Sequence, residues 1–314
     1  VAPAKDMPAD YQCLKTGALN TSNYYYRWNV TSLIDDYYEI KNSGNAPAGY
    51  APGMMLRYAD ESAETNDFYA GFYSGNANTE LKPSITLYYT DAKGIEDYYD
   101  SFASSPDNGG TGYVNSFNGN VTYINTLISE TGTRMPVTVS AVFNNADRSK
   151  NTFGLGNGWK FSFNQFIEHI TGAYEYYAYF DADGTVHYFS KYDGKFTDES
   201  GSGLDLTDDG SKITLTAEGN KGKVEFLYKS DGKAYISRAE DSAGNAQTYS
   251  YDGANVTKAT DGAGREITVT YSSGKVTKIT DPAGRATQFF YSGNTLSKIT
   301  YPDGKSVVFT YSGG

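Results

Sequence analysis

Hydrophobic and polar residues alternate along most of this chain, with the period of two that is typical of β-strands buried on one face. In one clear example, Ile85, Leu87 and Tyr89 fall on one face of a strand, and Ser84 and Thr86 fall on the other. Helical periodicity is almost absent. The pattern predicts an all-β fold, with strands near residues 24–30, 53–58, 67–73, 83–89, 121–128, 136–143, 159–167, 174–180, 186–189, 213–217 and 224–228.

A 20-residue repeat closes the chain. Three residue types recur at a constant spacing of 20 residues. They are the tyrosines Tyr251, Tyr271, Tyr291 and Tyr311, the glycines Gly244, Gly264, Gly284 and Gly304, and the aspartates Asp241, Asp261 and Asp281. In the last copy Tyr301 stands in place of the aspartate. In one copy a strand ends at Tyr271, a glycine turn follows, and a second strand leads to the turn that begins at Asp281. Each copy is therefore expected to form two strands and two tight turns. Stacked copies are expected to form a continuous sheet with a ladder of packed tyrosine rings.

Composition divides the chain into four parts. Residues 1–90 read as an N-terminal β-sandwich-like half-domain, and residues 91–112 read as a linker because turn-forming residues dominate there. Residues 113–220 resume as a β-rich segment, and residues 221–314 form the repeat array. The predicted fold is thus a sandwich-like half-domain followed by a sheet built from repeats.

Composition and charge exclude several classes of function. No apolar run approaches the roughly 20 residues of a membrane span, so none is expected. The net charge is −11, and residues 221–314, with 12 basic and 9 acidic residues, lack the concentrated positive field that nucleic acid requires. The single cysteine, Cys13, excludes an intramolecular disulfide. A large exported bacterial protein suits this composition, because such a protein does not depend on disulfides for its core.

Few side chains in the sequence suit catalysis. The sequence has two histidines. His169 follows Glu168, but adjacent residues of a strand point to opposite faces, so no dyad is expected there. His187 lies in a predicted strand and is interpreted as a surface or cavity-lining residue. The glycine-rich segment 154–158 precedes Trp159, but a strand-like alternation follows it, which excludes a nucleotide-binding loop. No enzymatic activity and no cofactor are expected.

One short segment resembles the start of a calcium loop. Asp181 and Asp183 have the spacing of the first two ligands, but Tyr192 stands at the twelfth position, where such a loop requires Glu. A hairpin turn is the favoured interpretation, and looser calcium binding at these two aspartates is the alternative.

An aromatic cluster near the N-terminus is the candidate binding site. Tyrosine and tryptophan side chains on a β-face can stack on sugar rings, although ordinary core and rim packing is the more frequent reason for such residues. The candidate residues for glycan stacking are Tyr24, Tyr25, Tyr26, Trp28, Tyr37 and Tyr69.

Several motifs in the chain resemble known families. The copy that runs from Gly264 through Tyr271 to Asp281 resembles the tyrosine–aspartate (YD) repeat of the Rhs and wall-associated protein families. Residues 113–189 resemble the segment that precedes such repeats, and residues 24–89 resemble the second half of the DNRLRE domain, whose naming motif is missing. The motifs that carry these two resemblances are Trp28-Asn29-Val30-Thr31, Pro83-Ser84-Ile85-Thr86-Leu87-Tyr88-Tyr89, Arg134-Met135-Pro136-Val137 and Gly156-Asn157-Gly158-Trp159.

The resemblance implies a structural function. In relatives of this kind the repeats spiral into a hollow β-shell that encloses a C-terminal toxin, so this chain would form the base and wall of such a shell. Its partner would be its own C-terminal effector domain, and its location extracellular or at the cell wall. The alternative is a cell-surface adhesin or carbohydrate-binding module, with the repeats as a stalk and cell-wall or host glycans as partners.

Overall fold

The chain divides into two units, residues 1–87 and residues 88–314, and the computed structural model describes most of the second. The described residues are 76, 93–95, 99–106, 109–171, 175–192, 195–198, 203–217, 219 and 221–312. The predicted half-domain of residues 1–90 lies outside these residues apart from Asn76, so it stays a prediction.

The all-β prediction is confirmed, because every regular element of the described residues is a strand apart from one 3₁₀ turn, Asn145–Asp147. The first five strands form an antiparallel sheet in sequence order, which we call the small sheet. They are β1 (Ser101–Ser104), β2 (Thr111–Asn115), β3 (Val121–Ser129), β4 (Thr138–Asn144) and β5 (Trp159–Phe161). β1 lies within the interval 91–112 that the composition assigned to a linker, and it pairs with β2 along its whole length.

The next eight strands close into a ring, which we call the barrel. They are β6 (Phe166–Ile170), β7 (Tyr176–Phe180), β8 (Val186–Tyr192), β9 (Lys195–Asp198), β10 (Leu204–Asp208), β11 (Lys212–Ala217), β12 (Gly222–Tyr228) and β13 (Ala234–Asp241). Consecutive strands pair antiparallel, and β13 pairs both with β12 and, through Ala234 and Tyr235, with β6. Eight strands enclose an interior just wide enough for side chains to fill. That interior holds Ile167, Tyr177, Tyr179, Phe189, Leu206, Ile213, Leu215, Phe226, Ala234 and Ile236.

The chain passes from the small sheet to the barrel at residues 162–165. A single strand over residues 159–167 was predicted, and this prediction is wrong, because β5 and β6 belong to different sheets. The side-chain oxygen of Asn164 accepts a hydrogen bond from the backbone N–H of Phe161, 2.8 Å away, and so turns the chain. Phe161 and Phe163 both remain in the core, with ring centroids 5.1 Å apart. The apolar alternation therefore continues through the turn and conceals it.

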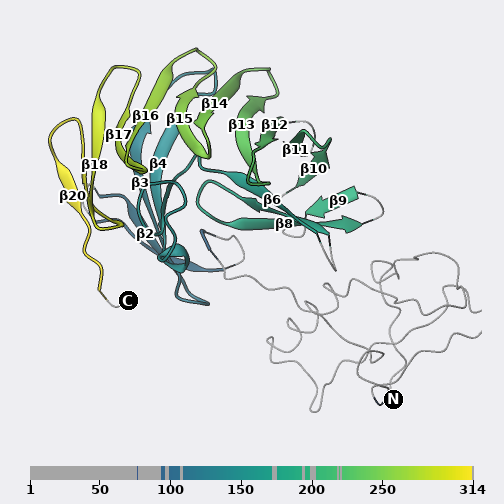
Figure 1. Ribbon diagram of the computed structural model, residues 1–314, viewed down its shortest axis with the longest axis horizontal. Helices are drawn as coiled ribbons and strands as arrows, with labels where there is room; N and C mark the ends of the chain where they lie inside the picture. The colour runs from purple at the N-terminus through teal and green to yellow at the C-terminus, as the bar shows by residue number, and fades with distance from the viewer. Residues whose placement is uncertain are drawn as a thin grey trace, which may run out of the picture. The chain divides into compact units, whose positions relative to one another are not determined.

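The repeats form hairpins that extend the sheet from β13, as Figure 1 shows in green to yellow. Their strands are β14 (Ala246–Asp252), β15 (Asn255–Thr260), β16 (Glu266–Ser272), β17 (Lys275–Thr280), β18 (Ala286–Ser292), β19 (Thr295–Thr300) and β20 (Ser306–Val308). Two strands and two tight turns per copy were predicted, and the structure agrees. β13 belongs to both parts, because its start pairs with β6 and its end pairs with β14. We call β13–β20 the repeat sheet.

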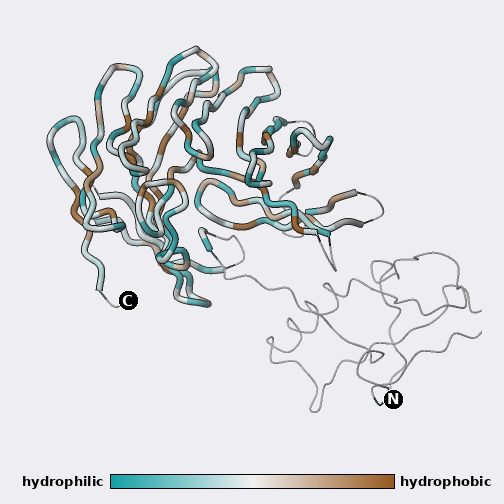
Figure 2. The backbone as a smooth tube through the Cα atoms, in the orientation of Figure 1, coloured by the Kyte–Doolittle hydropathy of each residue, from teal (hydrophilic) through white to brown (hydrophobic). Residues whose placement is uncertain are grey.

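The small sheet covers the apolar face of the repeat sheet. Figure 2 shows the alternation of hydrophobic and polar positions along these strands. One core cluster combines Val139, Ala141 and Phe161 of the small sheet with buried repeat residues such as Val276 and Ile279. The repeat hairpins are therefore one layer of a sandwich, and their apolar face is filled by protein side chains.

Candidate functional site

The aromatic cluster proposed for glycan stacking lies outside the described residues. This applies to all six of its members, Tyr24, Tyr25, Tyr26, Trp28, Tyr37 and Tyr69. Glycan stacking at these residues stays a prediction, and the site geometry described below comes from residues 93–312.

The repeat tyrosines connect each hairpin to the preceding one. Each hydroxyl donates a hydrogen bond to the backbone carbonyl oxygen 15 residues earlier in the chain. The four bonds run from Tyr251 to Ile236 (2.5 Å), from Tyr271 to Val256 (3.1 Å), from Tyr291 to Val276 (2.8 Å) and from Tyr311 to Leu296 (2.9 Å). No ring pair joins two of these four tyrosines, which are all described, so the ladder consists of hydroxyl-to-carbonyl bonds instead of packed rings.

Strand pairing explains why a tyrosine is needed at this position. Within one hairpin, β16 and β17 pair along their length, from Thr268 opposite Thr280 to Ser272 opposite Lys275. Between hairpins, β15 and β16 pair at only three positions near one end. Beyond these positions the two strands no longer pair, and the Val256 carbonyl accepts a hydrogen bond from the Tyr271 hydroxyl instead of from a backbone N–H of the neighbouring strand. A β-bulge at Tyr271 bends the strand at the same point.

The aspartates of the repeat shape the turns between hairpins. Asp261 accepts hydrogen bonds from the backbone N–H groups of Ala263 and Arg265 at 2.9 Å, and Arg265 Nε donates to its other oxygen at 2.7 Å. The N–H of Gly264 donates to the Asp261 carbonyl, and its φ of +81° favours glycine. Asp281 repeats these contacts with Arg285. The spacing of Asp and Gly is therefore a structural requirement of the turn.

The glycine-rich loop 154–158 runs across the tips of successive hairpins. The carbonyl of Gly154 accepts a hydrogen bond from the N–H of Val276, and the N–H of Asn157 donates to the carbonyl of Asn294, each at 2.9 Å. A Cβ on Gly154 would lie 2.5 Å from the Gly274 carbonyl oxygen, and one on Gly156 would lie 2.9 Å from the Leu296 nitrogen. Glycine is needed here for close approach of backbones. A strand, β5, follows the loop, as the alternation after it predicted.

The two calcium candidates lie in the hairpin between β7 and β8. Asp181 Oδ1 accepts hydrogen bonds from the N–H groups of Asp183 (3.1 Å) and Gly184 (3.0 Å). Asp183 Oδ1 accepts from the N–H and hydroxyl of Thr185, and its Oδ2 accepts from the N–H of Ile95 at 3.0 Å. The hairpin interpretation therefore fits the geometry.

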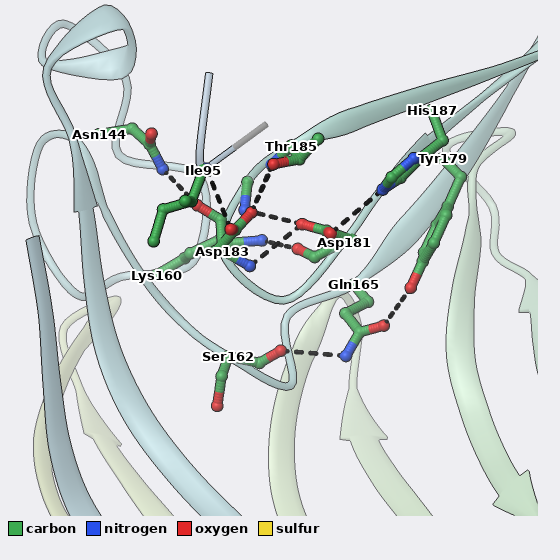
Figure 3. Close-up of polar contacts among 11 residues, drawn as sticks. Ile95, Asn144, Lys160, Ser162, Gln165, Tyr179, Asp181, Asp183, Thr185 and His187 are labelled. Carbon is green, nitrogen blue, oxygen red and sulfur yellow. Dashed lines mark hydrogen bonds and ion pairs between the residues drawn. The ribbon is translucent and has the colours of Figure 1, made fainter. Parts of the chain in front are cut away.

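Two residues of the small sheet hold this hairpin in place, as Figure 3 shows. Asn144 on β4 donates to the carbonyl of Asp183 at 2.7 Å, and its side-chain oxygen accepts from the N–H of Gly94. Lys160 on β5 donates to the carbonyl of Asp181. We call Asn144, Lys160, Asp181, Asp183 and the neighbouring His187 the hub, because they join the small sheet, the barrel and residues 94–95.

The ionisable groups of the hub influence one another. Burial, together with the charge of Asp181, raises the pKa of Asp183 to about 6. Burial opposes ionisation of Asp181 as well, but hydrogen bonds from His187 and the charge of Lys160 hold its pKa below the usual range. Burial lowers the pKa of Lys160 to about 8. Burial acts against the charged form of His187, but its contact with Asp181, 3.2 Å away, raises its pKa.

These contacts limit what the hub can do chemically. Every carboxylate oxygen of Asp181 and Asp183 already has a polar partner, so a calcium ion would have to displace backbone donors or His187. Among the residues that the structure describes, no group of three or more metal-ligating side chains is present. Calcium binding stays a prediction, and the observed role of the hub is to join strands.

Both histidines pack on tyrosines of the barrel. His187 lies opposite Tyr179 and its ring stacks 5.5 Å away, and His169 lies opposite Tyr177 with 4.2 Å between the rings. Sequence reasoning missed Lys160, whose partner is 21 residues away on another sheet. No local signal in the sequence could have revealed that contact.

Comparison with known families agrees with the repeat geometry. Residues 271–306 match the family model of the RHS repeat. This stretch contains Tyr271, Tyr291 and the Asp281 turn, so the chain contains an Rhs/YD-repeat region, as its resemblance implied. No curated protein matches the chain.

Proposed function

We propose that this chain is a structural, non-enzymatic part of an exported bacterial Rhs-type protein. In this proposal it forms the base and the first part of the wall of a β-shell that carries a C-terminal toxin or effector. One observation carries the proposal: the repeat sheet grows from a closed barrel through β13, while the small sheet fills its apolar face. Such an arrangement suits the closed end of a shell, where a wall must begin from a solid support.

The use of polar side chains supports a structural role. The repeat tyrosines satisfy backbone carbonyls, and the repeat aspartates satisfy turn amides. Asp183 accepts hydrogen bonds from Thr185 of its own hairpin and from Ile95 of another segment. Catalytic groups instead need an accessible position beside a substrate. The polar groups named here are instead engaged in holding strands and turns together.

An extracellular or cell-wall location is part of the same proposal. The RHS repeat match supports it, because such repeats are typical of extracellular and cell-surface proteins. The structure contributes a narrower finding: in its described part, no helix is long and apolar enough to cross a membrane.

Mass spectrometry of the native protein tests the cargo-carrying role. The protein is isolated from its producing cells under native conditions, and the true termini of every polypeptide that co-purifies with residues 88–314 are mapped. A long repeat array with a separate, tightly held C-terminal polypeptide is the expected result. A product that ends in a wall anchor without cargo would contradict the proposal and favour the adhesin alternative, in which the N-terminal aromatic cluster would be the glycan-binding site.

A further inference from the structure

The repeat departs from its own pattern at two positions whose side chains bind the small sheet or its connections. Tyr301 stands where the earlier copies have aspartate. Gln247 stands where the later copies have Ile267, Thr287 and Val307. The contacts of these two side chains show what the departures do.

The Tyr301 side chain connects the last repeat turn to β3. Asn125 Nδ2 on β3 donates a hydrogen bond to the Tyr301 hydroxyl at 2.6 Å, and Asn125 is 3% exposed. The Tyr301 ring packs against the core between the two sheets. In the earlier copies Asp261 and Asp281 direct their carboxylates toward their own turn amides. An aspartate at position 301 would therefore bind its own turn and leave Asn125 without this acceptor.

The last turn is complete without an aspartate at its first position. The N–H of Tyr301 donates to the Lys305 carbonyl at 2.8 Å, and the N–H of Gly304 donates to the Tyr301 carbonyl at 2.9 Å, as in the earlier turns. Asp303 Oδ1 accepts from the N–H of Lys305 at 3.0 Å, which is the contact that Asp261 makes with Arg265. Position 301 is thus available for a contact with the small sheet.

Gln247 makes the corresponding contact in the first copy. Its Nε2 donates to the backbone carbonyls of Met135 (3.2 Å) and Pro136 (3.0 Å), which lie in the connection between β3 and β4. Its side-chain oxygen accepts from the Tyr249 hydroxyl at 2.8 Å. The isoleucine that follows 20 residues later, Ile267, has no polar side-chain atom and is 1% exposed. Only the first copy can therefore bind these carbonyls through this position.

A contact between these two does not distinguish one copy from another. Arg265 Nη1 donates to the carboxylate of Glu130, just after β3, at 2.8 Å. Arg285, one copy later, binds Asp281 as Arg265 binds its own aspartate. A shift of the small sheet by one copy, which is two strands or about 10 Å, would exchange one arginine for the other. Glu130 alone thus leaves the position of the small sheet undefined.

The spacing of the contacts shows that β3 crosses the repeat strands. Asn125 and Glu130 are five residues apart, or about 17 Å in an extended strand. Their partners belong to turns two copies apart, and four strand spacings amount to about 19 Å. Asp281 and Arg285, from the turn between, lie beside the same stretch of β3. The small sheet therefore meets one repeat turn after another.

We propose that Gln247 and Tyr301 fix the register of the repeat sheet on the small sheet. A surface built from equal units offers several nearly equivalent positions to the layer that covers it, and specific polar contacts select one of them. The two departures from the repeat supply such contacts at its two ends. This inference is independent of the cargo-carrying role, because it rests only on contacts within residues 88–314.

Restoring the repeat residue at position 301 tests the proposal on the full chain. Substitutions toward the common residue of a family usually stabilise a protein. Tyr301→Asp should instead raise the unfolding equilibrium constant about tenfold in urea unfolding, because buried Asn125 loses its acceptor. The control Lys305→Arg restores the repeat arginine in the same turn, where the side chain is 76% exposed, and should change this constant less than about twofold. A Tyr301→Asp variant as stable as the wild type would overturn the proposal.

A double variant tests the register itself. Gln247→Thr with Tyr301→Asp removes both contacts and retains Glu130 and Arg265. After refolding, amide hydrogen exchange of residues 121–130, followed by mass spectrometry, should give one isotope envelope for the wild type and two for the double variant, because Glu130 can then meet either arginine. Adding Arg285→Gln should remove the second envelope, which separates a shifted register from general loosening. A single envelope in the double variant, or a second one that survives Arg285→Gln, would contradict the register role.

Discussion

Replacing Tyr271 by Phe removes one hydroxyl and tests whether the repeat is held together by its tyrosine bonds. The hydroxyl donates to the Val256 carbonyl at 3.1 Å, and the Val256 residue has 0% exposure. A lost hydrogen bond costs about 1 kcal/mol, and a buried carbonyl left without a donor costs about 1–3 kcal/mol. We expect the free energy of unfolding to fall by about 1–2 kcal/mol, which for a unit of this size lowers the thermal midpoint by about 2–8 °C.

The fluorescence of Trp159 provides the measurement. Trp159 is 3% exposed and lies in the core between the small sheet and the repeat sheet, so its emission reports their separation. All variants carry Trp28→Phe, which leaves Trp159 as the single tryptophan. Tyr113→Phe is the control, because no hydrogen bond of the Tyr113 hydroxyl occurs among the described residues. If urea unfolding gave the same midpoint for both variants, the tyrosine ladder would not be what joins the hairpins.

Three other changes test the close contacts, the turns and the hub. Gly156→Ala places a Cβ 2.9 Å from the Leu296 nitrogen at a φ of +107°. Urea unfolding should therefore show a fall in the free energy of unfolding of at least about 2 kcal/mol. The control is Gly244→Ala, which has open space around it and should lower the free energy of unfolding by only about 1 kcal/mol. Asp261→Ala removes the acceptor of two turn amides and of Arg265, so calorimetry should show a larger fall in thermal midpoint than for the exposed Asp303→Ala. Burial raises the pKa of Asp183 from 3.8 to about 6. The folded chain therefore holds this proton more tightly, and the stability gained at low pH is lost as the pH rises through about 6. Asp183→Asn should reduce the fall in the free energy of unfolding between about pH 4 and 7, measured by urea unfolding at each pH. An unchanged dependence on pH would contradict the assignment of this effect to Asp183.

The repeat could be predicted from sequence because its determinants are local. Asp261 reaches donors two and four residues away, and the turn of Gly264 closes over three residues. These short separations appear directly as the spacing of Asp and Gly. The role of the tyrosine was only partly predicted, since its bond to the preceding hairpin depends on where β15 and β16 stop pairing.

The barrel and the hub could not be predicted, because their contacts join distant parts of the sequence. Closure of the ring depends on Ala234 opposite Ile167, a pairing that leaves no periodic signal in either strand. The hub depends on Asn144 meeting the backbone of Asp183, 39 residues away and in another sheet. The apolar alternation around residues 162–165 even favoured one strand where the chain changes sheets.

The pairing of β13 determines the direction in which the repeat sheet can grow. A strand has two edges for hydrogen bonding, and β12 occupies one edge of β13 from Gly222 opposite Asp241 to Tyr228 opposite Ala234. The other edge is divided, with β6 at its start and β14 at its end. Because the barrel uses the rest of β13, the repeats can leave it on one side only. Each hairpin then pairs with the next at three positions near one end, as β15 does with β16, so the bend recurs with every copy. The repeat sheet therefore starts from a fixed strand and curves with a period set by the 20-residue repeat.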